Sequence, residues 1–311
     1  MNILVTGGAG FIGSNLCERL LANNFVICLD NFNDYYDPKI KENNIKDFLK
    51  NKNFKLYRAD ILDRKKLISI FNKHKIDKIV HLAARAGVRA SLKNPLLYNE
   101  VNVKGTLNLL DLTKEFKVKN FIFGSSSSVY GENKKIPFSE NDNLNNMISP
   151  YAISKRKAEK LCEDYSKLGL NITCLRFFTV YGPKGRPDMA VYKFTSKISK
   201  NEVIEVFGDG NSERDYTYVD DIVNGILSAL DKDFKFEIIN LGNSNPVKLG
   251  YLIKLIEKNL CKKAKIVRLG EQKGDVPRTY ADISKAKKLL SWEPKIKIEE
   301  GIKRFVEWYG K

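Results

Sequence analysis

Short apolar runs alternate with longer amphipathic segments through the first half of the chain. Strand-length apolar runs lie at 2–5, 25–30, 54–58, 78–81, 120–124 and 171–176. Segments with helical spacing of apolar residues lie between them at 11–23, 64–73, 95–116 and 150–167. Strands and helices in this alternation are typical of βαβ units, so we expect an α/β fold with a doubly wound parallel sheet.

The alternation becomes irregular from residue 179 onward. Glycine- and proline-rich turns at 181–187 and 207–210 interrupt it. We therefore expect a large domain of residues 1–176, with a returning segment near 216–242, and a smaller mixed α/β lobe of residues 177–215 and 243–311. No internal repeat or low-complexity segment is visible.

Composition narrows the class of protein. With 43% hydrophobic and 29% charged residues among 311, the chain can bury a substantial core. No apolar stretch approaches the roughly 20 residues of a bilayer helix. The N-terminus has no basic region, long apolar run and cleavage site in series. We expect a cytoplasmic enzyme without a membrane association.

The formal charge of +17 would suit an anionic partner. The lysines are spread along the whole chain, however, without the aromatic interleaving of a nucleic-acid groove. We interpret them as a solvated surface and expect no nucleic-acid partner. Five cysteines without a CxxC pair, and only two histidines, support neither a disulfide framework nor a metal site.

A glycine motif separates the first predicted strand from the first predicted helix. Gly7 suits the tight turn, Gly10 a close backbone approach to a pyrophosphate, and Gly13 the packing of helix on strand. Asp30 ends the second predicted strand, where a carboxylate accepts hydrogen bonds from both ribose hydroxyls. This arrangement predicts a Rossmann-type site for NAD, because the 2′-phosphate of NADP would meet like charge.

A second motif carries acid–base chemistry. Tyr151 and Lys155 are four residues apart at the start of a predicted helix, so they share one face. A neighbouring ammonium and a nicotinamide cation would favour the phenolate of Tyr151, which could then accept a proton from a sugar hydroxyl. Ser126 follows the strand at 120–124, at the carboxyl edge of the sheet, and could bond the same hydroxyl.

With these motifs in this order, the chain resembles the extended short-chain dehydrogenases/reductases of the nucleotide-sugar epimerase and dehydratase group. The resemblance runs nearly end to end, through HLAA at 81–84, NVKG at 102–105, RFFTVYGP at 176–183, RDYTYVDD at 214–221 and GDVPR at 274–278. It implies NAD that stays bound through the cycle, a UDP- or dTDP-sugar in the smaller lobe, and a homodimer built from the helices at 95–116 and 150–167.

The motifs and the resemblance together give a set of expected site residues. His81 is not among them, because we interpret it as a packing and hydrogen-bonding residue. The expected catalytic residues are Ser126, Tyr151 and Lys155. The expected NAD contacts are Gly7, Gly10, Phe11, Ile12, Gly13, Asp30, Asn31, Asp60, Ile61, Leu82, Ala83, Ala84, Asn102, Tyr151 and Lys155. The expected substrate contacts are Arg89, Ser126, Ser127, Ser128, Tyr151, Thr179, Arg186, Arg214, Asp275 and Arg278.

The choice of reaction depends on residues 127 and 128. Related 4,6-dehydratases carry an Asp–Glu pair there, and UDP-glucuronate decarboxylases carry a Glu, whereas this chain has Ser127 and Ser128. Without those acids the simplest reaction is epimerisation at C4. The resemblance implies transient oxidation of C4, rotation of the 4-keto sugar and return of hydride to its opposite face.

The sugar is suggested by Thr179 and Arg186, since an arginine fork and a hydroxyl suit a C6 carboxylate. With the RAGVR segment at 85–89, the chain most resembles UDP-glucuronate 4-epimerases, which interconvert UDP-glucuronate and UDP-galacturonate. Arg186 could instead pair with the diphosphate or lie on a loop, which leaves a UDP-glucose or UDP-N-acetylglucosamine 4-epimerase open. A diphosphate arginine of some neutral-sugar epimerases falls at Gln272 here. A decarboxylase, a dehydratase and a non-catalytic NAD-bound regulator are further alternatives.

Overall fold

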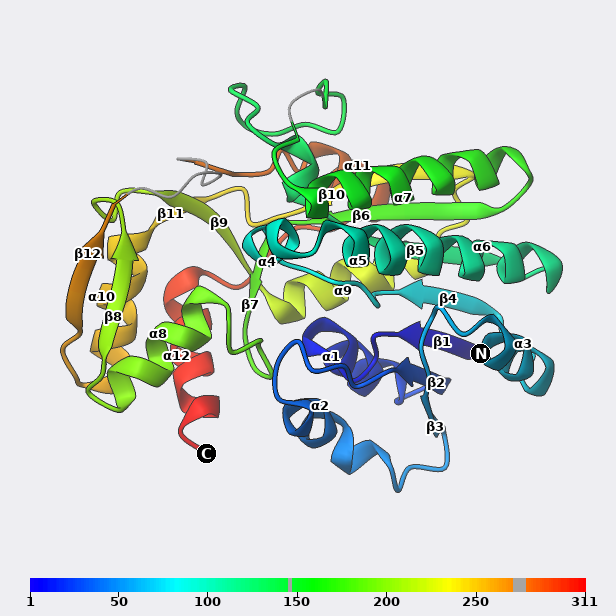
Figure 1. The fold of residues 1–311 in the computed structure, drawn as a ribbon, viewed down its shortest axis with the longest axis horizontal. Helices are drawn as coiled ribbons and strands as arrows, with labels where there is room; N and C mark the ends of the chain where they lie inside the picture. The colour runs from blue at the N-terminus through cyan, green and yellow to red at the C-terminus, as the bar shows by residue number, and fades with distance from the viewer. Residues whose placement is uncertain (145–146, 271–277) are drawn as a thin grey trace.

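A computed structural model describes residues 1–144, 147–270 and 278–311 of the chain. A seven-stranded parallel sheet forms its centre, in the order β10-β6-β5-β4-β1-β2-β3 (Figure 1). The strands are β1 (Asn2–Thr6), β2 (Phe25–Asp30), β3 (Phe54–Arg58), β4 (Lys78–His81), β5 (Asn120–Ser126), β6 (Asn171–Phe177) and β10 (Phe236–Leu241). The predicted doubly wound parallel sheet is confirmed, with the reversal of strand order between β1 and β4.

Helices cover both faces of this sheet because each strand alternates its apolar side chains between the two faces. Ile3 and Val5 of β1 pack in one hydrophobic cluster, whereas Leu4 packs in the other. The first cluster is closed by α1 (Phe11–Leu20) and α9 (Val219–Leu230), and the second by α3 (Arg64–Lys73), α6 (Gly105–Glu115) and α7 (Pro150–Lys167). Burial on both faces explains why these strands read as continuous apolar runs in the sequence.

The prediction of one continuous helix at 95–116 is wrong. The structure divides this segment into α5 (Pro95–Asn99), a π-helical segment (Glu100–Lys104) and α6. The side chain of Asn102, in the π-helical segment, turns inward and bonds the backbone of Arg85, which is a tertiary contact that periodicity cannot reveal. The short helices α2 (Pro38–Ile45) and α4 (Val88–Lys93) were not predicted, because α2 is mostly polar and α4 follows Gly87 in a loop.

The smaller lobe lies at one end of the molecule, at the left of Figure 1. It contains a three-stranded sheet in the order β11-β9-β7 and a parallel pair, β12-β8. Its strands are β7 (Thr179–Tyr181), β8 (Val203–Phe207), β9 (Glu213–Tyr218), β11 (Pro246–Lys248) and β12 (Lys265–Leu269). Its helices are α8 (Ala190–Ser199), α10 (Leu249–Leu260) and α12 (Ile298–Tyr309), and α11 (Ser284–Leu290) packs beside β10.

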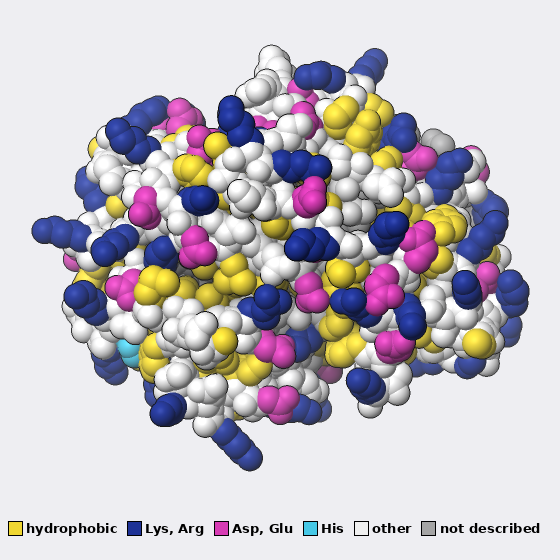
Figure 2. Space-filling model, turned by 180° about the vertical axis from the view of Figure 1, so that it is seen from behind, with side chains coloured by type: hydrophobic (Ala, Val, Ile, Leu, Met, Phe, Trp, Pro, Cys, Tyr) yellow, Lys and Arg dark blue, Asp and Glu magenta, His cyan; other side chains and the backbone are white. Residues whose placement is uncertain are grey.

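The surface agrees with the interpretation of the charge. Figure 2 shows lysine and arginine side chains scattered over one face of the molecule, with acidic side chains between them. Surface cations form ion pairs in the structure, and two examples from the whole molecule are Lys160 with Glu163 and Arg304 with Glu300. Within the described residues, no helix combines the length and the apolar character that crossing a bilayer requires.

Candidate active site

A cavity of about 520 Å³ opens at the carboxyl edge of the large sheet. The residues that line it come directly from or after the strand ends: Gly7 after β1, Asp30 at the end of β2, Asp60 after β3, Leu82 after β4 and Ser126 at the end of β5. Thr179 and Arg186 of the smaller lobe close its other side. Doubly wound sheets bind ligands at this edge, where the strand order reverses.

The glycine turn has the shape of a dinucleotide cradle. Gly7 has a φ of +69°, and a Cβ there would lie 2.7 Å from the Ala83 backbone nitrogen. A Cβ on Gly13 would overlap the Gly7 carbonyl oxygen, so α1 can approach the turn only without a side chain. This close packing places the start of α1 at the cavity, where the first N–H groups of the helix can face a phosphate.

Asp30 presents a carboxylate to the cavity, and the structure adds a partner that the sequence did not suggest. Its side chain is 4% exposed and accepts from the backbone N–H of Phe32 at 2.9 Å and of Ala9 at 3.3 Å. Lys41 of α2 lies 3.1 Å from the same carboxylate. These contacts hold Asp30 at the place where a ribose would bind, and Lys41 balances its buried charge.

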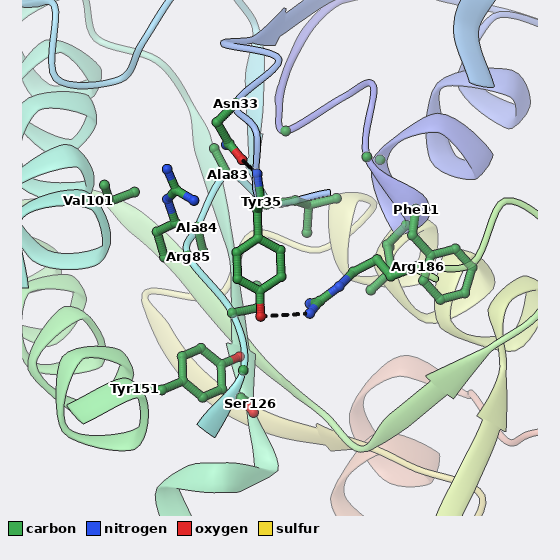
Figure 3. Close-up of a pocket in the computed structure, with 18 of the residues that line it drawn as sticks. Phe11, Asn33, Tyr35, Ala83, Ala84, Arg85, Val101, Ser126, Tyr151 and Arg186 are labelled. Carbon is green, nitrogen blue, oxygen red and sulfur yellow. Dashed lines mark hydrogen bonds between the residues drawn. The ribbon is translucent and has the colours of Figure 1, made fainter. Parts of the chain in front are cut away.

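Ser126 and Tyr151 meet in the cavity, as Figure 3 shows. Burial raises the pKa of Tyr151, while a hydrogen bond with Ser126 and the positive charge of Arg186 act in the opposite direction. Ser126 begins the turn after β5 and bonds Ser128 through its hydroxyl at 3.2 Å. A sugar hydroxyl placed between Ser126 and Tyr151 would therefore meet two groups able to exchange its proton.

Lys155 lies one helical turn beyond Tyr151 but is held by the sheet. Its ammonium donates to the Gly124 carbonyl oxygen at 2.6 Å. Burial lowers the pKa of Lys155 to about 8, against the negative charge of Glu159, which raises it. The ammonium thus lines the cavity from a fixed position at the end of β5, and its expected effect on the Tyr151 phenolate stays a prediction.

A buried polar network supports this side of the cavity from behind. Glu159 of α7 and Arg176 of β6 form a two-pronged ion pair at 2.8 and 2.9 Å, and their side chains are 0% and 1% exposed. Glu159 also accepts from the Ser125 hydroxyl at 2.7 Å, and Arg176 donates to the Tyr130 hydroxyl at 3.0 Å. The network joins α7, β5 and β6 next to Ser126 and Lys155.

His81 has the role expected from the sequence. Its ring nitrogens lie 2.7 Å from the Thr6 hydroxyl and 3.0 Å from the Thr106 hydroxyl. Burial, with Lys155 nearby, lowers its pKa to about 3, so the ring is neutral at physiological pH. Among the described residues, no three histidine, cysteine or acidic side chains are grouped so as to hold a metal ion.

The side of the cavity expected to hold the sugar contains Ser127, Ser128, Thr179 and Arg186. Arg186 pairs with Asp188 through Nε at 3.0 Å and Nη2 at 2.6 Å. The guanidinium also lies 3.4 Å from the Tyr35 hydroxyl, through Nη2 (Figure 3). A cation with its carboxylate partner and several hydroxyls therefore line this part of the cavity.

The profile of the NAD dependent epimerase/dehydratase family matches residues 3–242. The chain belongs to this family. The resemblance inferred from the sequence is thereby confirmed, and the glycine turn, Tyr151 and Lys155 all lie within the matched part.

The comparisons also find relatives along nearly the whole chain. A UDP-glucuronate 4-epimerase of Thermodesulfobacterium geofontis is 48% identical over 98% of this chain and 95% of its own. A crystal structure of a Bacillus cereus UDP-glucuronic acid 4-epimerase, in complex with UDP-glucuronic acid and NAD, is 38% identical, with a TM-score of 0.93 over 100% of this chain and 99% of that chain. A UDP-glucose 4-epimerase of Thermotoga maritima, with UDP-glucose, is 37% identical, with a TM-score of 0.92 over the same shares.

The structure places most of the expected site residues around the cavity and a few of them away from it. Every expected NAD contact except Asn102 lines the cavity. Asn102 instead bonds the backbone of Arg85 at 2.8 and 2.9 Å, and Ser154 at 2.9 Å, so it supports a lining loop. Of the expected substrate contacts, those outside the lining are Arg89, beside Phe207; Arg214, on β9; and Arg278, paired with Glu213. Asp275 and Gln272 lie outside the described residues.

The lining residues that sequence reasoning missed include three polar ones on the side of Arg186: Tyr35, Arg85 and Asp188. Tyr35 belongs to the polar segment 31–37, which has no period to place it. Arg85 entered the sequence analysis only as part of the RAGVR segment, and Asp188 was not singled out there. One signal could have indicated Tyr35. It lies only five residues after Asp30 in the sequence, and a residue that close to a strand end can still reach the edge of the sheet.

Proposed function

We propose that this protein is an NAD-dependent UDP-sugar 4-epimerase, an isomerase, and that its substrate pair is UDP-glucuronate and UDP-galacturonate. The observation that carries the proposal is one cavity containing Ser126 and Tyr151, the dinucleotide cradle and Arg186, with serines at 127 and 128. The relatives named UDP-glucuronate 4-epimerase, and the Bacillus cereus complex with UDP-glucuronic acid and NAD, support it.

NAD fits the residues that are present. Gly7, Gly10 and the start of α1 would hold the pyrophosphate, Asp30 the adenosine ribose, and Lys155 the ribose nearest the reacting carbon. The remaining cofactor contacts are expected from Phe11, Ile12, Gly13, Asn31, Asp60, Ile61, Leu82, Ala83 and Ala84. When bound, NAD supplies a reversible hydride acceptor, so that C4 is oxidised and reduced again without net redox change.

The protein's own residues move the proton and orient the sugar. Tyr151 accepts the proton of the C4 hydroxyl and later returns it, while Ser126 holds the same oxygen. The serines at 127 and 128 orient the sugar by hydrogen bonds and offer no acid for eliminating water. Thr179 and Arg186 face the sugar from the smaller lobe, where Arg186 would bind a C6 carboxylate.

A neutral sugar is the second candidate, and one observation favours it. Arg186 already shares two of its donors with Asp188, so the pair carries no net charge toward the cavity. The Thermotoga maritima relative is named a UDP-glucose 4-epimerase and has the same fold over the whole chain. UDP-glucose and UDP-N-acetylglucosamine are therefore the competing substrates.

The deciding experiment incubates purified protein with UDP-glucuronate, UDP-glucose or UDP-N-acetylglucosamine and separates the nucleotide sugars. UDP-galacturonate from the first is the expected product. A UDP-pentose would indicate a decarboxylase, a 4-keto-6-deoxy sugar a dehydratase, and no product with any substrate a non-catalytic protein. Faster conversion of UDP-glucose than of UDP-glucuronate would favour the neutral-sugar epimerase.

The two parts of the chain divide this work. Residues 1–176 and the returning segment near 216–242 bind NAD, and residues 177–215 and 243–311 bind the nucleotide sugar. Arg214, Asp275 and Arg278 are proposed for its nucleotide end, and Arg89 is a further proposed substrate contact. Removal of the cofactor followed by reconstitution tests the first assignment. NAD should restore activity and NADP should restore little, because Asp30 would face the 2′-phosphate.

A homodimer completes the proposal. Leu96 and Ile153 are exposed apolar side chains on α5 and α7, within the segments 95–116 and 150–167 that are expected to pair between two copies. Sedimentation equilibrium of the wild type and of Leu96→Glu tests this, because a charge placed in an apolar interface would dissociate the dimer.

A further inference from the structure

Tyr35 reaches the sugar side of the cavity from a loop that starts at the NAD side. The loop 31–37 leaves β2 at Asp30 and is built from successive side-chain-to-backbone bonds. The backbone N–H of Phe32 donates to Asp30, that of Asn33 to Asn31 at 3.1 Å, and that of Tyr35 to Asn33 at 3.2 Å. These turns direct the ring of Tyr35 into the cavity, between Arg186 and Tyr151 (Figure 3).

The ring of Tyr35 meets two guanidinium groups. The Arg186 Cζ lies 5.0 Å from the ring centroid and the Arg85 Cζ 5.9 Å from it, both within the range of a cation–π contact. The hydroxyl accepts from Arg186 Nη2 at 3.4 Å, which is long for a hydrogen bond. The cation–π contact of the Tyr35 ring with Arg186 is therefore stronger than the hydrogen bond of the Tyr35 hydroxyl with Arg186.

Arg186 keeps free donors beyond these contacts. A guanidinium has five N–H groups. Asp188 accepts from Nε and from Nη2, and Tyr35 accepts from Nη2. Within the described residues, none of these three bonds uses the two Nη1 hydrogens, which can therefore bond a ligand. A carboxylate that bonds Nη1 and Nη2 together would compete with the long Tyr35 bond, while the shorter Asp188 bonds stay in place.

The position of Tyr35 is fixed on its other side by the loop that follows β4. A Cβ on Gly87 would lie 2.5 Å from the Tyr35 hydroxyl oxygen, so this approach depends on glycine. Tyr98 donates to the Ala86 carbonyl oxygen at 2.8 Å and lies edge-on to the ring of Tyr151, with centroids 6.2 Å apart. Tyr35 is thus confined between Arg186 and the residues packed around Tyr151.

We propose that Tyr35 is a positioning residue that selects for uronate sugars, by holding the Arg186 guanidinium over the cavity in the pose that receives a C6 carboxylate. This inference rests on the proposed function. The aromatic ring supplies most of the effect, and the hydroxyl serves as a weak acceptor that the substrate carboxylate replaces. A sugar without charge at C6 gains nothing from this positioning.

The test compares wild type, Tyr35→Phe and Tyr35→Leu with UDP-glucuronate and with UDP-glucose. Loss of the ring in Tyr35→Leu should raise KM for UDP-glucuronate about 3- to 30-fold, the range expected from a cation–π contact, with little change in kcat. Tyr35→Phe keeps the ring and should restore KM to within about threefold of wild type, because the lost hydrogen bond is long. KM for UDP-glucose should stay within about twofold, because only contacts with the C6 charge are lost.

A second set of variants asks whether Tyr35 acts through Arg186. In an Arg186→Ala background, Tyr35→Leu should have no additional effect on UDP-glucuronate, because the group that it positions is gone. Tyr57→Leu is the matched control, since Tyr57 is a tyrosine of β3 that bonds His74 at 2.7 Å and does not line the cavity. It should leave both KM values unchanged whatever it does to thermal stability.

Three outcomes would overturn the inference. An equal rise of KM for both sugars, a further loss in the Arg186→Ala background, or a matching rise in the Kd of NAD measured by calorimetry would assign Tyr35 to general packing or to the cofactor. Failure of the proposed function has a different signature, because the wild type itself would then leave UDP-glucuronate unconverted.

Discussion

The two walls of the cavity are built in different ways. One wall, called the catalytic wall after its proposed role, comprises Ser126, Tyr151 and Lys155. It is supported by regular elements and by the ion pair of Glu159 with Arg176, whose side chains are 0% and 1% exposed. The other, called the sugar wall after its proposed ligand, comprises Tyr35, Thr179, Arg186 and Asp188. It is held largely by loops, and the Arg186–Asp188 pair is 19% and 41% exposed.

This difference indicates how the fold separates chemistry from selectivity. Proton transfer needs groups fixed to a fraction of an ångström, which buried and fully paired polar groups provide. Recognition of a sugar substituent can change through a few loop residues while the scaffold stays the same. The solved relatives fit this division, because neighbours named for UDP-glucuronic acid and for UDP-glucose share one fold with this chain.

The largest effect should come from the catalytic wall itself. Tyr151→Phe removes the proton acceptor but keeps the ring packed against Tyr98, so kcat should fall by about 10²- to 10⁴-fold. Steady-state kinetics measures the loss, and calorimetry should show nearly unchanged NAD binding. Near-normal turnover would remove Tyr151 from the mechanism.

The buried support of this wall can be broken without touching the cavity. Glu159→Ala leaves Arg176 buried and unpaired, which should lower the free energy of unfolding by about 3–5 kcal/mol. Urea denaturation measures it, with Glu163→Ala as the control on the same helix. Glu163 forms exposed pairs with Lys160 and Lys167, so its loss should cost at most about 1 kcal/mol. Equal costs would contradict the contrast between a buried and an exposed support.

On the sugar wall, Arg186→Ala should act on one substrate only. Loss of a charge-assisted hydrogen bond of about 1.5–3 kcal/mol predicts a fall in kcat/KM for UDP-glucuronate of about 10- to 150-fold. UDP-glucose, without charge at C6, should be little affected. Measuring kcat/KM for both sugars separates the possibilities, since an equal fall on both would reassign Arg186 to the shared diphosphate.

The smallest effect concerns the pH dependence of the catalytic wall. Burial lowers the pKa of Lys155 to about 8, so its charge is present below that pH and lost above it. If the ammonium is required, activity should fall by about tenfold between pH 7 and pH 9. Lys155→Arg keeps its charge in this range, and its lower activity should be flat over the same interval. A wild-type profile without an alkaline decline would show that the ammonium is dispensable.

The sequence predicted the catalytic wall better than the sugar wall. Strand ends, the glycine turn and the spacing of Tyr151 and Lys155 are local patterns, and the topology of a doubly wound sheet brings them to one edge. Gly13 illustrates this, because the nearest atoms that a Cβ there would meet belong to Gly7 and Gly8 of the same βα unit, whereas the space needed at Gly7 depends on Ala83, which follows β4.

Features that depend on long-range contacts were not predicted. The π-helical segment forms where Asn102 bonds the backbone of Arg85, 17 residues away. Lys41 contacts Asp30 only when α2 is packed over the cavity. Arg186 was predicted to face a substrate carboxylate, yet its pairing with Asp188 depends on the local turn of a loop. No hydrophobic period reports on such contacts, because they involve polar side chains in irregular backbone.

The loop 31–37 joins Asp30, at the expected adenosine ribose, to Tyr35, at the expected sugar carboxylate, through an unbroken series of short turns. Two ligands that each favour the same ordered form of this loop are thermodynamically linked. Such linkage is reciprocal. If bound cofactor increases the affinity for the sugar by some factor, bound sugar increases the affinity for the cofactor by the same factor. An epimerase that must retain its cofactor over many turnovers would then hold it most firmly while a sugar is bound.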